Sequence, residues 1–264
     1  MDLTASNPTQ CGFTYDAERL LAPLSDPSAM NYEPIPRGML SAREAVCRYY
    51  ADHAMRLDAS QIFLTTSTSE AYSFLFRLLC DSGDEVLIAQ PSYPLFDFLA
   101  TLDDVRLAPY SLVYDHGWQI DVASLRGVIT SRTRAIVVVN PNNPTGHYTK
   151  PWERAVLEDL CREFGLALIV DEVFLDYPLN REGKSAEFSF AGGQASVPTF
   201  VLSGLSKVVG LPQMKASWIA CLGPETERRE AEARLEIVAD TFLSMNAPIQ
   251  YALQIGRASC RERV

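Results

Sequence analysis

AIVVVNPNNPTG, residues 135–146, is the stretch that decides the fold of this chain. The run Ile136–Val139 is apolar without alternation, as expected for a strand buried on both faces of a parallel sheet. Asn142-Asn143-Pro144 then predicts a turn. Open α/β sheets bind their ligands outside the carboxyl ends of the strands, so the polar residues after this strand are candidates for a binding site.

The same alternation of element types extends outward on both sides. Apolar residues at helical spacing predict helices over residues 40–54, 69–80, 151–164 and 225–242. Short apolar runs predict strands over residues 62–65, 86–89, 105–108, 136–140, 167–171, 199–203 and 217–222. This order is typical of an α/β fold with a doubly wound, mainly parallel sheet and helices on both faces.

Composition narrows the class of function. The net charge of −10, with 23 Lys and Arg against 33 Asp and Glu, gives no positive surface for nucleic acid. The apolar runs are too short for a membrane span, and the acidic start Met1-Asp2-Leu3 is unlike a signal peptide. Six scattered cysteines without a CxxC pair, and three histidines, argue against a disulfide framework or a metal centre. We expect a cytoplasmic protein that acts on a small molecule.

The end of the chain is different in character. Residues 255–264, IGRASCRERV, break from the apolar sequence before them. The string matches one reading frame of a common sequencing adapter, so we expect it to be an artefact and the native sequence to stop at about residue 254.

Polar groups follow three of the predicted strands. They are Asn140–Gly146, Asp171-Glu172 and Ser203–Lys207. A turn, a solvated strand end or an exposed lysine would explain each one alone. Because the carboxyl ends of parallel strands share one edge of the sheet, the three groups are expected to meet there.

In this order and spacing the groups resemble the signature of the class I/II aminotransferases, which have the pyridoxal-phosphate (PLP) fold type I. Further segments that match the family are Ser6–Thr9, Tyr32–Pro34 with Gly38 and Arg43, Thr65–Ala71, Gly83–Leu87 and Pro91–Tyr93. The resemblance covers nearly all of Leu3–Gln254. It implies an N-terminal segment bordering the substrate site (1–30), a large PLP-binding domain (31–224), and an interdomain helix that begins an incomplete small domain (225–254).

The resemblance also implies a role for each residue around the cofactor ring. Lys207 matches the lysine that holds PLP as a Schiff base and later moves the substrate α-proton. Asp171 matches the carboxylate that keeps the pyridine nitrogen protonated, so that the ring withdraws electrons. Asn143 matches the amide that binds the ring oxygen O3′, and Tyr93 matches the aromatic residue that stacks on the ring.

The phosphate of the cofactor is expected at the start of the helix over 69–80. Backbone N–H groups at a helix N-terminus attract anions, and Ser67, Thr68 and Ser69 add hydroxyl groups there. Further candidates for the phosphate are Ser203, Ser206 and Lys215. By the same resemblance Tyr32 reaches the phosphate of a neighbouring subunit, which implies a homodimer with shared active sites.

Three departures from the common family pattern affect the cofactor site. Phe174 stands where many members have a tyrosine that also binds O3′. Lys215 replaces an arginine, which keeps the charge but loses the two-pronged hydrogen bonding of a guanidinium. Ser67 stands at a frequent glycine position, and Gly204 at the position of a phosphate-binding serine.

The resemblance implies an aminotransferase that exchanges an amino group between an L-amino acid and a 2-oxo acid. A PLP-dependent β-lyase is an alternative, because the same cofactor site serves both reactions. An aminotransferase-like ligand-sensing regulator is another, although no basic helix-turn-helix precedes residue 6. The family's substrate-carboxylate arginine lies in the C-terminal small domain, beyond this sequence. We therefore expect the fragment alone to be inactive, with the apolar face of its 225–242 helix uncovered.

Overall fold

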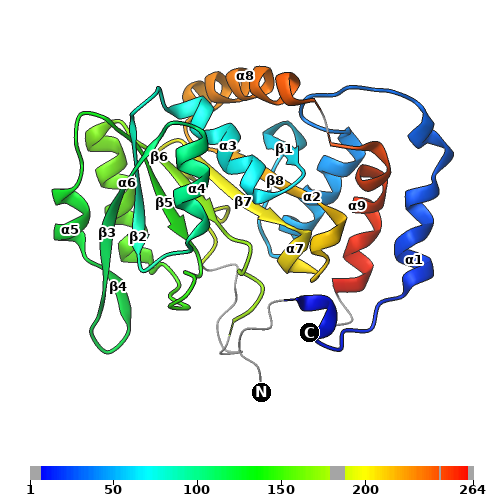
Figure 1. Cartoon of the computed structure of the whole chain (residues 1–264), viewed down its shortest axis with the longest axis horizontal. Helices are drawn as coiled ribbons and strands as arrows, with labels where there is room; N and C mark the ends of the chain where they lie inside the picture. Colours follow the sequence, from blue (N-terminus) through cyan, green and yellow to red (C-terminus); the bar gives the residue numbers. More distant parts are fainter. Residues whose placement is uncertain (1–6, 179–187, 244, 261–264) are drawn as a thin grey trace.

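A computed structural model describes residues 7–178, 188–243 and 245–260, the last seven of these by their backbone only. Its centre is an eight-stranded sheet in the order β1-β8-β7-β6-β5-β2-β3-β4 (Figure 1). The strands are β1 (Ile62–Thr65), β2 (Glu85–Gln90), β3 (Arg106–Tyr114), β4 (Trp118–Ile120), β5 (Thr133–Val139), β6 (Ala167–Asp171), β7 (Thr199–Gly204) and β8 (Ser217–Leu222).

Parallel pairing runs through the middle of this mixed sheet. Strands β7, β6, β5, β2 and β3 are parallel to their neighbours in that series, whereas β8 is antiparallel to both β7 and β1, and β4 is antiparallel to β3. The carboxyl ends of β2, β5, β6 and β7 therefore lie at one edge of the sheet. That edge is where the polar groups of the sequence were expected to meet.

Helices connect the strands and cover both faces of the sheet. They are α1 (Ala17–Leu21), α2 (Leu40–Asp52), α3 (Thr68–Leu79), α4 (Leu95–Leu102), α5 (Val122–Gly127), α6 (Pro151–Phe164), α7 (Leu205–Val208), α8 (Glu225–Phe242) and α9 (Ala247–Cys260). Short 3-10 helices lie at Pro8–Gln10, Ala22–Ser25, Pro27–Met30, Ala59–Gln61 and Pro212–Met214. Within the described ranges, no helix has the length and apolar character needed to span a bilayer.

Two apolar layers sandwich the sheet, because alternate residues of each strand point to opposite faces. Ile169 of β6 joins the layer formed with α3, α4 and α8, while its neighbours Leu168 and Val170 join the layer formed with α2, α5 and α6. All five residues of β6 are buried. The prediction of continuous apolar strands covered on both faces is confirmed.

The packing of α8 corrects one expectation. Leu235 and Ala239 are buried in the same apolar layer as α3, and Ala231 and Val238 pack against it. The α8 helix lies directly over α3 in Figure 1. The expectation that the apolar face of this helix stays uncovered is therefore wrong for most of its length, because the large domain itself buries that part, while Phe242 at its end is 49% exposed. Ile237, on another side of α8, remains exposed.

The N-terminal and C-terminal parts of the described chain lie together. Helix α9 packs against α2 and against α1 with the 3-10 helix after it, at the right of Figure 1. Its backbone continues through Cys260, into the stretch expected to be an artefact.

Candidate active site

Three strand ends bring the predicted polar groups to one edge of the sheet. Val139, the last residue of β5, pairs with Asp171 at the end of β6, and Asp171 pairs in turn with Leu202 of β7. Helix α7 follows β7 at once and carries Lys207. The loop after β2 leads to Tyr93 just before α4. The residues that the sequence placed after separate strands thus meet at a common edge.

Asp171 is the buried acid of this edge. Its side chain faces α3, because Ile169 two residues earlier lies in the α3 layer. The residue is only 8% exposed. Oδ1 accepts a hydrogen bond from the Val173 backbone N–H at 3.1 Å, and Oδ2 accepts one from the Tyr72 hydroxyl at 3.1 Å. Burial raises the pKa of Asp171 to about 6, and these two bonds and the charge of Lys207 limit the rise.

Lys207, on α7, is contacted by the turn that follows β6. Its ammonium nitrogen lies 5.4 Å from the centre of the Phe174 ring, which belongs to the turn after β6. The Tyr177 hydroxyl, from the same turn, donates a hydrogen bond to the Lys207 carbonyl oxygen. The turn after Asp171 therefore contacts both the side chain and the backbone of the lysine.

Gly204 is the last residue of β7 and directly precedes α7, the helix that carries Lys207. The Leu205 backbone N–H donates to the Ala216 carbonyl oxygen at 2.9 Å, which joins α7 to the segment before β8. A Cβ atom on Gly204 would lie 2.8 Å from that carbonyl oxygen and within collision distance of the Ser217 side chain. Any side chain here would push the two segments apart. The glycine that replaces the family serine therefore lets the start of α7 lie close to residues 216 and 217.

Helix α3 supplies the candidate anion site. Ser67 caps the helix, since its hydroxyl oxygen accepts a hydrogen bond from the Glu70 backbone N–H at 3.1 Å. The same hydroxyl group carries a hydrogen that it can donate to a ligand. Thr68 and Ser69 are the first residues of the helix, so their backbone N–H groups have no partner within it. The three residues are half-buried, and the positive end of the helix dipole favours a phosphate there.

The other phosphate candidates are less closely grouped. Ser203 is buried, and its hydroxyl oxygen has no hydrogen-bond partner among the described residues. It lies two residues after Val201 and so points to the α2 and α6 face, opposite the face that α3 covers. Ser206 is half-buried on α7, and Lys215 is exposed in a left-handed conformation. Which of these contact a phosphate stays a prediction.

The loop after β5 is joined to the loop after β2. The side-chain nitrogen of Asn142 donates to the Pro91 carbonyl oxygen at 3.3 Å and to the Thr145 hydroxyl at 3.0 Å. Its side-chain oxygen is buried without a partner among the described residues. Asn143 itself is half-buried and Tyr93 is 49% exposed. Both predicted ring contacts therefore retain a surface that a ligand could cover.

Tyr72 and Glu172 take part in this region although the sequence reasoning gave them no role. Glu172 is buried on the face opposite Asp171, where the Ser189 hydroxyl and the Phe190 backbone N–H donate to it, each at 2.7 Å. Burial raises its pKa to about 7. The sequence could have indicated a role for Glu172, because it is an acid at a strand end next to Asp171. Tyr72 gave no such signal, because an aromatic residue at helical spacing usually belongs to the core.

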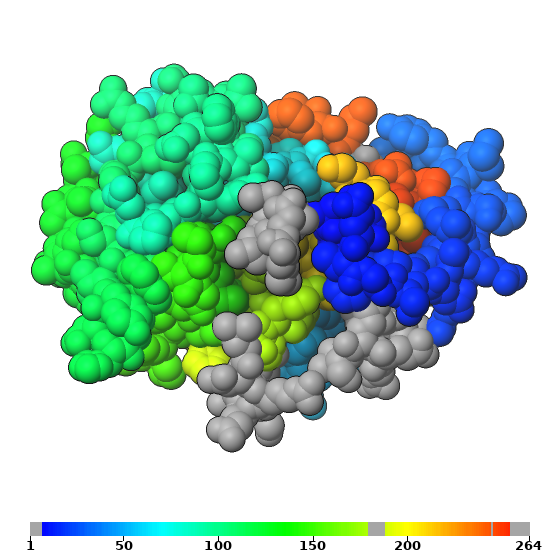
Figure 2. Space-filling model, turned by 60° about the horizontal axis from the view of Figure 1, so that its bottom comes forward, coloured from blue at the N-terminus to red at the C-terminus, as the bar shows by residue number. Residues whose placement is uncertain are grey.

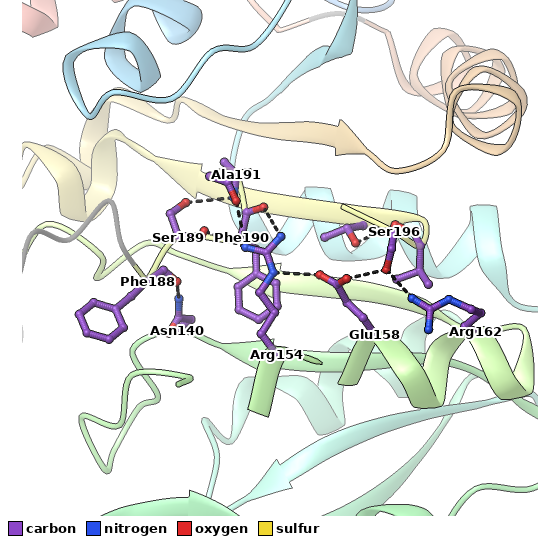
Figure 3. Close-up of polar contacts among 12 residues, drawn as sticks. Asn140, Arg154, Glu158, Arg162, Phe188, Ser189, Phe190, Ala191 and Ser196 are labelled. Atoms are coloured by element: carbon purple, nitrogen blue, oxygen red, sulfur yellow. Dashed lines mark hydrogen bonds and ion pairs between the residues drawn. The ribbon is translucent and has the colours of Figure 1, made fainter. Parts of the chain in front are cut away.

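The Glu172 side of the site is braced by α6. Arg154 of α6 donates to the carbonyl oxygens of Ser189 at 3.2 Å and Gly192 at 3.0 Å, and its Nε donates to Glu158 at 2.9 Å (Figure 3). Asn140 donates to the Phe188 carbonyl oxygen at 2.7 Å. These bonds fix residues 188–192 and the loop that carries Asn143.

The N-terminal segment lies beside the lysine-bearing turn. The Tyr15 hydroxyl donates to the carbonyl oxygens of Val209 at 3.1 Å and Gly210 at 2.9 Å. Figure 2 shows this segment, in dark blue, against the yellow segment that contains α7. Leu20 also packs with Val209 and Leu211. Tyr32, by contrast, is 81% exposed.

The chemistry of this edge matches that of a cofactor site. A lysine amine can bind an aldehyde covalently. A buried carboxylate can pair with a protonated ring nitrogen, and a helix N-terminus can hold a phosphate. The profile of the family described as "Aminotransferase class I and II" matches residues 3–256. The chain belongs to this family, whose cofactor is pyridoxal 5′-phosphate.

Curated relatives cover most of this chain but extend well beyond it. An alanine aminotransferase of Mycobacterium tuberculosis is 33% identical over 87% of the chain and 53% of its own length. A glutamate-pyruvate aminotransferase of Escherichia coli is 30% identical over 96% of the chain and 62% of its own length. The chain thus spans between about half and two thirds of these relatives.

Solved structures share the fold. A crystal structure of an aminotransferase from Escherichia coli has a TM-score of 0.82 and 29% identity, and the match covers 94% of this chain and 61% of that one. An alanine aminotransferase from Pyrococcus furiosus has a TM-score of 0.82 and 25% identity, over 97% of this chain and 66% of its own. The expected fold, the large domain of PLP fold type I, is confirmed.

The residues at the sheet edge fit the cofactor. The cofactor carries an aldehyde, a basic ring nitrogen and a phosphate, and the edge offers one suitable group for each in Lys207, Asp171 and the α3 N-terminus. When bound, PLP supplies a ring that accepts the electrons of the substrate α-carbon. The protein has to bind the ring, orient it and keep its nitrogen protonated.

Proposed function

We propose that this chain is the cofactor-binding part of a PLP-dependent aminotransferase, which exchanges an amino group between an L-amino acid and a 2-oxo acid. The observation that supports the proposal is the meeting of Lys207 with the buried carboxylate of Asp171 beside the N-terminus of α3. The relatives named for alanine and for glutamate-pyruvate make alanine, glutamate and pyruvate the first substrates to test.

In this proposal Lys207 binds the cofactor covalently and afterwards moves the substrate α-proton with its freed amine. Asp171 holds the proton on the ring nitrogen, Asn143 donates to the ring oxygen O3′, and Tyr93 covers one face of the ring. The cofactor phosphate binds at Ser67, Thr68 and Ser69. Additional phosphate ligands are proposed from the group Ser203, Ser206 and Lys215.

A homodimer is part of the same proposal. Tyr32 is exposed and so has a side chain that a second subunit could contact. We assign it to the phosphate of a neighbouring subunit, so that each active site is completed by its partner. The domain limits proposed are 1–30, 31–224 and 225–254, with 255–264 foreign to the protein, and the location proposed is the cytoplasm.

Reduction with borohydride tests the covalent assignment. Borohydride should fix PLP to the wild-type chain at Lys207, and peptide mapping should place the label there. Lys207→Ala should lose both the yellow colour and the label. A control is Lys150→Ala, which removes an amine at the start of α6 that has no proposed cofactor contact and should leave the label on Lys207. Labelling of a different lysine in the wild type would refute the assignment.

Product analysis of the complete native protein tests the reaction class. A transaminase converts alanine to pyruvate and retains the amino group on the cofactor, so pyruvate should form without ammonia. A β-lyase would instead release ammonia together with pyruvate from a substrate with a leaving group on its β-carbon. A ligand-sensing regulator would bind cofactor and amino acid without either product. Only the first outcome supports the proposal.

A further inference from the structure

Tyr72 places a phenol against the acid of the cofactor site. It lies on α3, is 3% exposed, and its hydroxyl oxygen is 3.1 Å from Oδ2 of Asp171. The ring is wedged edge-on against Phe96 of α4 with the two ring centres 5.0 Å apart. Its orientation is therefore set by packing, and the hydroxyl cannot turn to water instead.

The two oxygens of Asp171 are held from two directions. Tyr72 donates to Oδ2 from the helix layer, while the Val173 N–H donates to Oδ1 from the turn after β6. Lys207 of α7 is the charged group that faces this carboxylate among the described residues. Two fixed donors determine the plane of a carboxylate, whereas one would leave it free to rotate.

The phenol is suited to stabilise the ionised form of the acid. Burial and the neighbouring carboxylate raise the pKa of Tyr72 well above its usual value, so it stays protonated and remains a donor. A hydrogen bond to a charged acceptor counteracts the burial that raises the pKa of Asp171. Without the phenol, the buried carboxyl would take up a proton more readily.

The position of Tyr72 on α3 links the two ends of the cofactor site. Residues 68 and 69 offer the N-terminal N–H groups of the helix, and residue 72 lies one turn further on. One rigid helix thus carries the proposed phosphate site and also holds the acid proposed for the ring nitrogen.

We propose that Tyr72 is a positioning residue for PLP, which aims the carboxylate of Asp171 at the ring nitrogen and keeps it charged. This inference rests on the proposed function. A buried tyrosine that only fills the core could donate its hydroxyl hydrogen to any backbone carbonyl oxygen. Tyr72 donates instead to the carboxylate of the cofactor site, so we assign it more than a packing role.

Tyr110 provides the matched control. It lies on β3 and is buried as well, and its hydroxyl donates to the Val137 carbonyl oxygen at 3.0 Å. Tyr72→Phe and Tyr110→Phe each remove one buried hydroxyl and leave the ring. Only the first change removes a donor from Asp171, so the pair separates a general loss of stability from an effect on the acid.

The measurement is the dissociation constant of PLP as a function of pH, followed by absorbance. Tyr72→Phe should weaken binding on the order of tenfold near neutral pH. It should also move the acidic limb of the binding curve up by about one pH unit, with a smaller effect in alkali where Asp171 is ionised in both proteins. Tyr110→Phe should leave the limb in place.

Replacement of Tyr72 by 3-fluorotyrosine gives a second test that keeps the shape of the side chain. Because this phenol is a stronger donor, the acidic limb should move the other way, to lower pH. A limb that stays in place with Tyr72→Phe and with the fluorinated residue would overturn the inference while leaving the proposed function intact. A wild-type chain that fixes no PLP to Lys207 would overturn both.

Discussion

The ammonium group of Lys207 lies over the ring of Phe174, 5.4 Å from its centre. The two residues come from neighbouring strand ends, and the contact shows that position 174 faces the lysine. At this position many family members carry a tyrosine, and its phenol would bind the ring oxygen of the cofactor. The phenylalanine offers a ring face to the lysine but no donor.

Phe174→Tyr should therefore lower the pKa of the PLP chromophore bound to Lys207. A phenol that donates to O3′ stabilises the anionic form of this oxygen and so favours loss of the chromophore proton. The measurement is an absorbance titration of the PLP-bound chain. Phe164→Tyr, in an exposed ring at the end of α6 just before β6 begins, is the control and should leave this pKa unchanged. A rise or no change with Phe174→Tyr would mean that position 174 does not face O3′.

Asp171→Asn should remove the negative charge at the cofactor ring while the fold is kept. Asn keeps the shape of the side chain, but it cannot hold the pyridinium proton, so turnover of the complete protein should fall sharply. PLP binding should weaken as well. Unchanged turnover would remove Asp171 from the role proposed for it.

The same substitution predicts a pH dependence of stability in the cofactor-free chain. The folded pKa of Asp171, about 6, lies above that of an unfolded aspartate. Its contribution to stability is therefore fully present below the unfolded pKa and is lost as the pH rises from about 4 through about 6. Wild type minus Asp171→Asn should show this fall, of about 1–3 kcal/mol in the free energy of unfolding. Urea unfolding at pH 4, 5, 6, 7 and 8 measures it, and a flat difference would mean that burial does not raise the pKa of Asp171.

The fold could be predicted from the sequence where a strand is a continuous apolar run with a clear end. Ala167–Asp171 and Ser217–Leu222 were predicted with the limits that the structure has. Trp118–Ile120 was not predicted, since a three-residue strand at the sheet edge has no measurable period. Leu95–Leu102 was missed as well, because a short helix with few polar residues shows little helical alternation.

The candidate site was predictable where its residues follow strands directly, as Asp171 and Lys207 do. Tyr72 could not be predicted, because its partner lies 99 residues further along the chain. The sequence also gave no reason for the glycine at position 204. That reason lies in the approach of two segments, and only the folded chain shows it.

Gly204→Ala should destabilise the chain through this close approach. A Cβ atom at position 204 collides with the Ala216 carbonyl oxygen and the Ser217 side chain, so the turn before Lys207 has to move. We expect a loss of about 1–3 kcal/mol in the free energy of unfolding, as for overpacking elsewhere. PLP affinity should fall with it, because Lys207 is displaced.

Gly127→Ala is the matched control for this change. A Cβ atom at Gly127, at the end of α5, meets nothing within 4 Å, so this variant should keep its stability or gain slightly. The measurement is the thermal unfolding temperature of the two variants compared with that of the wild type. Equal stability of all three would show that the segments at Gly204 separate easily.

The last prediction concerns the chain as it stands, and it separates cofactor binding from catalysis. The proposed cofactor contacts all lie in the described part of the chain, so residues 1–254 should take up PLP. Transamination also requires the substrate carboxylate to be held so that the α-hydrogen stands perpendicular to the ring. Such orientation contributes on the order of 7–11 kcal/mol in favourable cases.

Three arginines of the N-terminal part, at positions 19, 37 and 43, are the first candidates for a carboxylate anchor within this chain. Arg37 is paired with Glu236 at 2.9 Å and with Glu232 at 3.7 Å. Arg43 donates to the carbonyl oxygens of Gly38 and Ala59. Arg19, on α1, is exposed. Two of the three candidates are thus already engaged within the fold.

We therefore expect residues 1–254 to bind PLP weakly and to transaminate alanine at a rate close to that of free PLP. The burial of α8 against α3 should keep this piece more soluble than an open apolar face would allow. The assay compares pyruvate formation by the chain, by Lys207→Ala and by PLP alone at equal cofactor concentration. Turnover at the level of a complete aminotransferase would mean that the anchor lies within these residues, and Arg19→Ala would then be the first variant to test.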